Sequence, residues 1–313
     1  MRHSVIVAKV MVYFIYHSDY QLDWPNHVFR GDKFALIYEQ LIGEGIINEI
    51  NLLAPEPATQ DQVQLVHRSA YLERLKFIAR HNPELGRREC EVPVSESVLK
   101  AFYLAVGGTI LACQKALETH SAAINLQGGF HHAFPAHGEG FCLLNDLAIA
   151  VRVLQKQALI QRAMIIDCDL HQGNGTAFIF KGDPSVFTFS IHQENTYPKK
   201  EKSRLDIGLD DGTGDDDYLN LLHMHIPEII GKHRPELIIC QSGVDPFEDD
   251  QLGNLRLTKW GLAERDRYIF QTVRQAGIPL AVTLGGGYPT RMQDMIDLHC
   301  QTARILKEFF APA

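Results

Sequence analysis

The amino-acid sequence predicts an α/β fold in which a central parallel β-sheet is flanked by helices on both faces. Short apolar runs rich in β-branched residues alternate along the chain with longer segments of helical period, which is the pattern of such a sheet. Internal repeats, low-complexity tracts and Gly/Ser linkers are absent from the sequence. We therefore expect a single domain that spans residues 1–313.

The expected strands are short apolar runs bounded by turn-forming residues. They are Val10–Tyr16, Ile46–Leu53, Ala122–Leu126, Ala163–Asp167, Val186–Ser190, Leu237–Gln241 and Leu280–Leu284. The first lies in an apolar stretch, Val5–Tyr16, that is shorter than the ~20 residues of a membrane-spanning helix and lacks a signal-peptide cleavage site. No other run is long enough to span a bilayer, so we expect a soluble protein without membrane association.

Helices are expected between the strands, where apolar residues recur at helical spacing. Their predicted ranges are Asp32–Ile42, Ala70–Arg80, Ser95–Thr119, Asn145–Gln157, Asp215–His233, Lys259–Ala276 and Thr290–Phe310. Ligands of open α/β sheets bind outside the carboxyl ends of the strands. The residues that follow each predicted strand are therefore the first candidates for a functional site.

Composition and charge exclude several classes of protein. The formal net charge of −8 leaves no general basic surface for nucleic-acid phosphates or an anionic membrane. The six cysteines are scattered without a C-x-x-C pair, which argues against a disulfide framework, a zinc ribbon or a thioredoxin-type site. A reducing compartment and the absence of nuclear-import basic clusters together predict a cytoplasmic protein.

Polar residues gather after four of the predicted strands. These segments are Gly128-Gly129-Phe130-His131-His132, Asp167-Cys168-Asp169-Leu170-His171, Ser242-Gly243-Val244-Asp245 and Gly285-Gly286-Gly287-Tyr288. Because the strands are expected to be parallel, their carboxyl ends lie along one edge of the sheet. The four segments are therefore expected to converge on one pocket.

A divalent metal site is one interpretation of these segments. Asp167, Asp169 and His171 alternate with apolar residues, so in extended backbone they project toward the same side. Asp169, His171 and Asp245 would leave an open position for water and substrate, as catalytic zinc requires, with Asp167 behind them. Iron(II) or manganese could compete for so oxygen-rich a site. Carboxylates at this spacing serve equally well as helix caps or loop residues.

His131 and His132 suit proton transfer, because an imidazole has a pKa near neutrality. Tyr288, behind three glycines, offers a phenol that can stabilise an oxyanion. The glycine tract lacks G-x-G-x-x-G spacing and a Walker lysine, so a nucleotide-phosphate site is disfavoured. The remaining histidines, for example His223 and His299, are expected at the solvated surface or in local hydrogen bonds.

In these motifs the chain resembles the histone deacetylase superfamily, which has the arginase/deacetylase fold. The resemblance runs from about Asn26 to Ile305 through G-G-F-H-H-A (128–133), G-F-C-L-L-N-D (140–146), D-C-D-L-H-Q-G-N-G (167–175), S-G-V-D (242–245) and G-G-G-Y (285–288). Segments 171–175, 211–215 and 250–253 are most similar to the class IV branch.

The resemblance implies zinc-dependent hydrolysis of the side-chain amide of acyl-lysine in a protein or peptide. The implied zinc ligands are Asp169, His171 and Asp245. Tyr288 and the metal polarise the scissile carbonyl, an activated water attacks it, and the two histidines move the protons. Alternatives are an acetylpolyamine or other small-amide hydrolase and a non-catalytic acyl-lysine binding module, although binding alone would need neither Tyr288 nor both histidines.

In the family the first histidine hydrogen-bonds an Asp that matches Asp167, and the second pairs with the residue that matches Asn174. Many relatives have Asp at the latter position. An amide cannot stabilise an imidazolium by charge, so His132 is expected to stay neutral more readily than His131. Which histidine is the base and which the acid is left open.

The resemblance also implies a potassium site at positions matching Asp167, Asp169, His171, Ser190 and Ile191. Gly140 and Phe141 match a channel wall that grips the lysine alkyl chain, and Tyr197 is expected to face it. Leu252 stands where polyamine-selective relatives carry an acidic residue, which favours acyl-lysine. No residue of 81–91 clearly matches the family's rim aspartate. The acyl chain length and the oligomeric state are left open.

Overall fold

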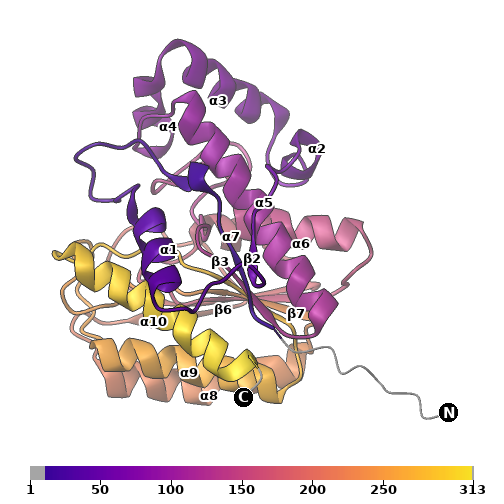
Figure 1. The fold of residues 1–313 in the computed structure, drawn as a ribbon, viewed down its shortest axis with the longest axis vertical. Coiled ribbons are helices and arrows are strands. Elements are labelled where there is room, and N and C mark those ends of the chain that lie inside the picture. The colour runs from indigo at the N-terminus through magenta and orange to yellow at the C-terminus, as the bar shows by residue number, and fades with distance from the viewer. Residues whose placement is uncertain (1–10, 312–313) are drawn as a thin grey trace.

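The structure is a computed structural model that describes residues 11–311. One sheet holds eight strands in the order β2-β1-β3-β8-β7-β4-β5-β6, and all neighbouring pairs are parallel. Figure 1 shows helices on both sides of this sheet. The predicted α/β class with a central parallel sheet is therefore confirmed. The part of Val5–Tyr16 before residue 11 lies outside the described residues.

The predicted strands all overlap observed ones. The strands are β1 (Tyr13–Ile15), β2 (Leu52–Leu53), β3 (Ala122–Asn125), β4 (Ala163–Asp167), β5 (Val186–Gln193), β6 (Leu205–Leu209), β7 (Leu237–Gln241) and β8 (Leu280–Thr283). The sequence does not predict β6, because Asp206 and Gly208 interrupt its apolar residues. β6 forms one end of the sheet, where alternation of this kind leaves polar residues in water.

The predicted strand Ile46–Leu53 is wrong for residues 46–51, which form a turn. The Asn48 side chain accepts a hydrogen bond from the N–H of Ile50, and the Asn51 side chain donates one to the carbonyl of Ile46. Asparagine side chains thus satisfy backbone groups that a strand would pair with its neighbour. Only Leu52–Leu53 pairs with β1.

The longer helices agree with the predicted ranges to within two residues at either end. The helices are α1 (Lys33–Gly43), α2 (Gln60–Val63), α3 (Ser69–His81), α4 (Arg87–Cys90), α5 (Glu96–Thr119), α6 (Asp146–Lys156), α7 (Asn174–Ile179), α8 (Asp215–His233), α9 (Lys259–Gln275) and α10 (Met292–Phe310). Ser95, Asn145 and Thr258 accept hydrogen bonds from the first turns of α5, α6 and α9 and thereby fix where these helices begin.

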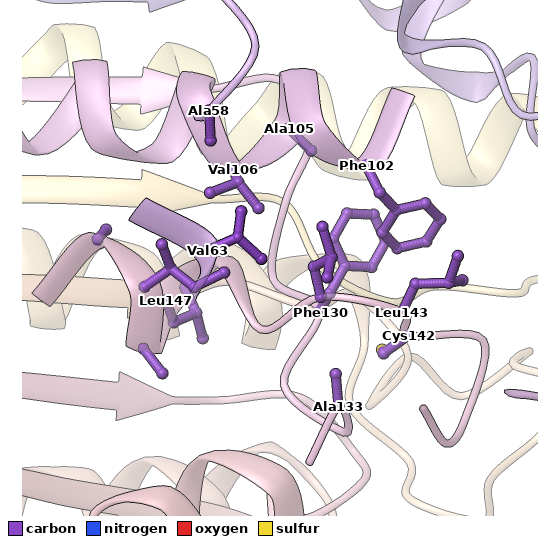
Figure 2. Close-up of a cluster of buried hydrophobic side chains, with 14 of the residues drawn as sticks. Ala58, Val63, Phe102, Ala105, Val106, Phe130, Ala133, Cys142, Leu143 and Leu147 are labelled. Carbon is purple, nitrogen blue, oxygen red and sulfur yellow. The ribbon is translucent and has the colours of Figure 1, made fainter. Parts of the chain in front are cut away.

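The sheet separates two apolar clusters, because its central strands are buried on both faces. Consecutive strand residues point to opposite faces, so Ile165 joins the cluster under α5 and α6, and Ile166 joins the one under α8, α9 and α10. Figure 2 shows the first cluster, in which the rings of Phe102 and Phe130 lie 4.3 Å apart between centroids. Phe130 connects this core directly to the loop that carries His131.

Within residues 11–311, α5 is the helix long and apolar enough to cross a membrane, by length and composition alone. The expectation that no run is long enough therefore needs this correction. In the structure 61% of the apolar window of α5 is buried inside the protein. α5 packs against α6 and against β3, as a core helix does.

The topology explains how distant segments meet. β3, β8, β7 and β4 are consecutive neighbours in the sheet and all run in the same direction. Their carboxyl ends therefore lie side by side along one edge. The four polar segments that follow these strands come together there, although they are spread over residues 128–288.

Candidate active site

The loop after β3 presents the two adjacent histidines. Gly128 and Gly129 adopt φ angles of +89° and +85°, a region that favours glycine. The buried carboxylate of Asp146, the first residue of α6, accepts hydrogen bonds from the N–H groups of Gly129 and of the next residue. The glycines let the loop close on Asp146, and this closure fixes the backbone that carries His131 and His132.

The segments after β4 and β7 bring together Asp169, His171 and Asp245. One ligand atom from each residue lies within 4.8 Å of the other two, and all three side chains are buried. His171 Nδ1 lies 3.1 Å from Asp245 Oδ2 and 3.3 Å from Asp169 Oδ1. Two carboxylates and one imidazole are a donor set for a divalent cation with coordination positions left open.

The electrostatics of this cluster also favour a cation. Burial lowers the pKa of His171, but hydrogen bonds and charges from Asp169 and Asp245 outweigh burial and raise the pKa to about 10. Burial, together with the negative charge of Asp169, raises the pKa of Asp245 to about 8. Both shifts include the effect of neighbouring buried carboxylates, which place an excess of negative charge at this point. A bound metal ion would neutralise that charge, so the residues fit a metal.

Neighbouring donors hold the two carboxylates in place. Asp169 Oδ2 accepts hydrogen bonds from Gln241 Nε2 at 2.9 Å and from the N–H of Gly286 at 3.0 Å. Asp245 Oδ1 accepts one from the N–H of Leu170 at 2.8 Å. Groups of this kind orient metal ligands. The sequence reasoning missed Gln241, whose only signal is its position as the last residue of β7.

The structure places Asp167 behind the cluster, against His131. His131 Nδ1 lies 2.7 Å from Asp167 Oδ2, and His131 Nε2 lies 3.7 Å from Asp169 Oδ1. Burial lowers the pKa of His131, but the negative charges of Asp167 and Asp169 outweigh it and raise the pKa to about 9. The carboxylate of Asp167 therefore favours the protonated form of His131.

His132 has the opposite electrostatics. Its Nδ1 lies 2.8 Å from Asn174 Oδ1. Burial, and then the positive charges of His131 and His171, hold the pKa of His132 well below its usual value. This is the direction expected from an amide at residue 174, so His132 is the neutral member of the pair.

A cavity of about 210 Å³ leads to these residues. It is lined by Glu91, His132, Gly140, Phe141, His171, Tyr197, Leu252 and Tyr288, which include all four predicted channel residues. The walls are largely apolar and the inner end is polar, which suits an alkyl chain that ends in an amide. Glu91 is an acidic lining residue that the sequence comparison with the family's rim aspartate did not identify.

Two side chains fix the backbone of Tyr288 by hydrogen bonds. Its N–H donates to Asp250 Oδ2 at 2.6 Å, and its carbonyl accepts from Gln251 Nε2 at 2.9 Å. Burial, followed by the charges of Asp169 and Asp245, raises the pKa of the phenol, so it stays a hydrogen-bond donor. Sequence reasoning missed the role of Asp250, because the contact joins residues 38 positions apart.

The residues implied for potassium lie on adjacent strands. In the register of β4 and β5, Asp167 stands opposite Ser190, and Ile191 follows it. The Ser190 hydroxyl is 2.9 Å from His192 Nδ1. The structure thus brings Ser190 and Ile191 next to the strand that leads to Asp169 and His171, and the potassium site stays a prediction.

The expectation that His299 lies at the surface or in a local hydrogen bond is wrong. His299 is fully buried on α10, and neither ring nitrogen has a hydrogen-bond partner among the described residues. Burial, and then the charge of Lys33, hold its pKa well below the usual value. It lies at helical spacing from the buried residues Met295, Ile296 and Ala303 of α10, and that periodicity was the available signal.

Similarity to known proteins agrees with this geometry. Residues 27–303 match the family model described as histone deacetylase domain. The chain is 40% identical over 298 residues to an uncharacterised protein of Picosynechococcus sp., covering 95% of this chain and 98% of that protein. It is 32% identical to histone deacetylase 2 of Arabidopsis thaliana, over 91% of this chain and 76% of that protein.

A further relative is a probable deacetylase of Archaeoglobus fulgidus, 32% identical over 88% of this chain and 80% of that protein. Among solved structures, the HD domain of HDA15 aligns with a TM-score of 0.82 at 22% identity, covering 94% of this chain and 90% of that one. The latter shows a shared fold. From the family match and the identities to its relatives, the chain belongs to the histone deacetylase family, a family of hydrolases.

Proposed function

We propose that the protein is a zinc-dependent deacylase that hydrolyses the side-chain amide of acyl-lysine in a protein or peptide. One observation carries the proposal. The buried cluster of Asp169, His171 and Asp245 lies at the inner end of a cavity that is lined on the way in by Phe141 and Tyr197. An acyl-lysine side chain has the matching shape, an extended alkyl chain that ends in an amide.

Each residue around the cluster then has one role in the hydrolysis. When bound, zinc supplies Lewis-acid polarisation of the carbonyl and acidifies a water molecule. Tyr288 donates its phenolic proton as a hydrogen bond to the carbonyl oxygen as negative charge develops there. Neutral His132 accepts the proton of the attacking water through Nε2, because Asn174 occupies its Nδ1, and it returns that proton to the lysine nitrogen as the C–N bond breaks. His131 stays protonated beside Asp167 and stabilises the negative charge.

The space around the cluster supports a short acyl group. The innermost cavity has a volume of about 20 Å³, close to that of one water molecule, and Phe29, Phe130 and Cys142 are among its lining residues. Asp169 and His171 line the same space, so a metal and its water would occupy it, and a long fatty acyl chain would require Phe29 and Phe130 to move. We therefore propose acetyl-lysine as the preferred substrate.

A second candidate is an acetylpolyamine hydrolase, which one observation favours. Glu91 lines the cavity, and a carboxylate there can pair with a cationic substrate. Leu252 lines the same cavity and offers such a substrate no charge. Because Leu252 occupies the position where polyamine-selective relatives carry an acidic residue, acyl-lysine remains the first proposal.

The deciding experiment compares turnover of the zinc-loaded protein on acetyl-lysine peptide, on acetylspermidine, and on lysine peptides with longer acyl chains. We expect the acetyl-lysine peptide to be hydrolysed fastest. We also expect Asp169→Ala and His171→Ala to abolish turnover while the circular dichroism spectrum is unchanged. Full turnover by a metal-free Asp169→Ala protein would refute the metal-dependent proposal. Faster hydrolysis of acetylspermidine than of the peptide would favour the acetylpolyamine hydrolase over the acyl-lysine deacylase.

Two further assignments are proposals of the same kind. The motifs at 171–175 and 250–253 support class IV. All six cysteines are free and buried, which supports a reducing, cytoplasmic location.

A further inference from the structure

Three side chains form a hydrogen-bonded chain that runs outward from the inner end of the cavity. His132 Nδ1 lies 2.8 Å from Asn174 Oδ1, and Asn174 Nδ2 lies 2.9 Å from Glu139 Oε1. We propose that Glu139 is a positioning residue, which fixes the orientation of the Asn174 amide and thereby selects the tautomer of His132. The inference rests on the proposed function, in which His132 accepts a proton through Nε2.

The need for such a residue follows from the symmetry of an amide. The oxygen and nitrogen of Asn174 have nearly the same size, so a half-turn of the amide changes little in packing. In the observed orientation Oδ1 accepts from His132, which places the ring proton on Nδ1 and leaves Nε2 free to accept. After a half-turn, Asn174 Nδ2 would require an acceptor at Nδ1, and the ring proton would move to Nε2.

Glu139 distinguishes the two orientations because an ionised carboxylate only accepts hydrogen bonds. The observed orientation gives it a charge-assisted hydrogen bond from Asn174 Nδ2. The turned orientation would place Asn174 Oδ1 against Glu139 Oε1, oxygen against oxygen. Water screens this contact little, because Asn174 is only 1% exposed and the Glu139 side chain is 26% exposed. The charge of Glu139 can therefore favour one orientation of the Asn174 amide over the other.

Two backbone groups favour the same orientation. The N–H of Gly175 donates to Asn174 Oδ1 at 3.0 Å, and the carbonyl of Lys199 lies 3.5 Å from Asn174 Nδ2. Glu139 is the closer acceptor of Asn174 Nδ2 and the charged one. Its loss should therefore weaken the preference for one orientation without making the turned orientation the dominant one.

The backbone of Glu139 is fixed independently of its side chain. Its N–H and carbonyl form a bridge with the backbone of Cys142, just before Gly140 and Phe141 enter the channel wall. The Glu139 carboxylate faces two further ionisable groups. His137 Nε2 lies 3.7 Å away, and burial, together with the charge of Glu139 and a hydrogen bond to it, raises the pKa of Tyr197. A substitution at residue 139 can thus change the side-chain contacts while the loop is retained.

The first measurement reads the tautomer directly, by ¹⁵N NMR of the His132 ring in the zinc-loaded protein. We expect the Nδ1–H form in the native protein and a larger share of the Nε2–H form in Glu139→Gln, because a glutamine amide can also donate toward residue 174. Glu194→Gln removes one negative charge elsewhere and serves as the matched control. An unchanged His132 tautomer in Glu139→Gln overturns the inference.

The second measurement is a double-mutant cycle on turnover of acetyl-lysine peptide. Glu139→Gln alone should lower kcat roughly ten-fold with little change in KM, a fraction of what general acid–base catalysis contributes. In Asn174→Asp either carboxylate oxygen of residue 174 can accept from His132, so no residue is needed to orient it. The negative charge of Glu139 then repels this carboxylate, so adding Glu139→Gln to Asn174→Asp should raise kcat. Equal losses in both backgrounds would show that Glu139 does not act through Asn174.

The two measurements separate this inference from the proposed function. If no acylated substrate is hydrolysed but the His132 tautomer responds to Glu139→Gln, the positioning role holds and the function fails. If acetyl-lysine is hydrolysed and neither tautomer nor kcat responds, the function holds and the positioning role is wrong.

Discussion

His131 and His132 are neighbours in sequence and in space, with ring centroids 4.0 Å apart, yet their surroundings shift the two pKa values in opposite directions. His131 Nδ1 meets a carboxylate oxygen of Asp167, whereas His132 Nδ1 meets an amide oxygen of Asn174 and its ring lies beside the positive charges of His131 and His171. A carboxylate compensates the cost of burying a positive charge, and an amide does not. The two rings thus favour a single positive charge, and it resides on His131.

At the residue scale, Tyr288→Phe tests the oxyanion role. The change removes one hydrogen-bond donor, so we expect kcat for acetyl-lysine peptide to fall roughly 10²- to 10³-fold with KM little changed. The backbone hydrogen bonds to Asp250 and Gln251 stay, so the ring should keep its place and the thermal midpoint should change little. A kcat within two-fold of the native value would rule out this role for the phenol.

The candidate site residues that the sequence predicts share one property, which is that their signal is local. Asp169 and His171 lie two positions apart at the end of a strand, and Tyr288 follows a glycine tract. Glu91, Gln241 and Asp250 acquire their roles through contacts between segments far apart in sequence, or through lining a cavity that several segments build. No spacing along the chain could have predicted those contacts.

At the scale of elements, His67 connects the helical segment α2–α3 to α6. His67 Nε2 accepts a hydrogen bond from the N–H of Asn145, the residue that caps α6, and Nδ1 lies 3.0 Å from the carbonyl of Phe134. Both ring nitrogens are thus used by the neutral Nδ1–H tautomer. A proton on Nε2 would break the bond to Asn145, and burial lowers the pKa of His67 to about 4.

This arrangement predicts a pH-dependent stability. Since the pKa of His67 is about 4 when folded against about 6.5 when unfolded, the unfolded state binds the proton more readily between those values. The contribution of neutral His67 to the free energy of unfolding is complete above pH 6.5 and is lost as the pH falls toward 4. Relative to His67→Gln, the native protein should lose about 2 kcal/mol of unfolding free energy between pH 7 and pH 5.

Urea denaturation of both proteins without metal, at pH 7, 6 and 5, measures this difference. Because other histidines titrate in both proteins, only the difference between the two reports on His67. A difference that stays constant with pH would mean that His67 does not titrate as proposed.

The sequence predicts the long helices well and the short elements poorly. Caps such as Ser95 and Thr258 mark helix starts, and a helix of 24 residues such as α5 repeats its apolar period many times. α7 has only six residues, and β6 depends on pairing with β5 at the end of the sheet. Such elements form through contacts with the rest of the fold rather than through their own pattern.

At the scale of the whole molecule, metal binding should be coupled to stability. The buried carboxylates of Asp169 and Asp245 lie beside one another, and a cation that binds only the folded state relieves their repulsion. We expect zinc to stabilise the protein by about 2.7 kcal/mol when its free concentration is 100 times the Kd. The shift of the thermal midpoint measures the effect, and shifts at equal free concentrations of zinc, iron(II) and manganese rank the affinities of the site for these metals.

Asp245→Ala is the control for that prediction. It should abolish the shift, because it removes one ligand from the cluster. An equal shift in Asp245→Ala would place the responsible metal elsewhere. The shift in the native protein should also shrink at low pH, because protons held by the His171 and Asp245 pair compete with the metal.

The single direction of all eight strands has a practical consequence at the edge opposite the cavity. There the turns before β5 and β8 contain Gly182 and Gly277, both exposed and with open space around them. Their φ angles of +80° and +66° favour glycine, so an insertion should keep both glycines. A whole strand separates each turn from the chemistry. A short peptide tag or a surface-attachment linker inserted at either glycine should leave acetyl-lysine turnover intact and orient an immobilised molecule with its cavity facing the solution.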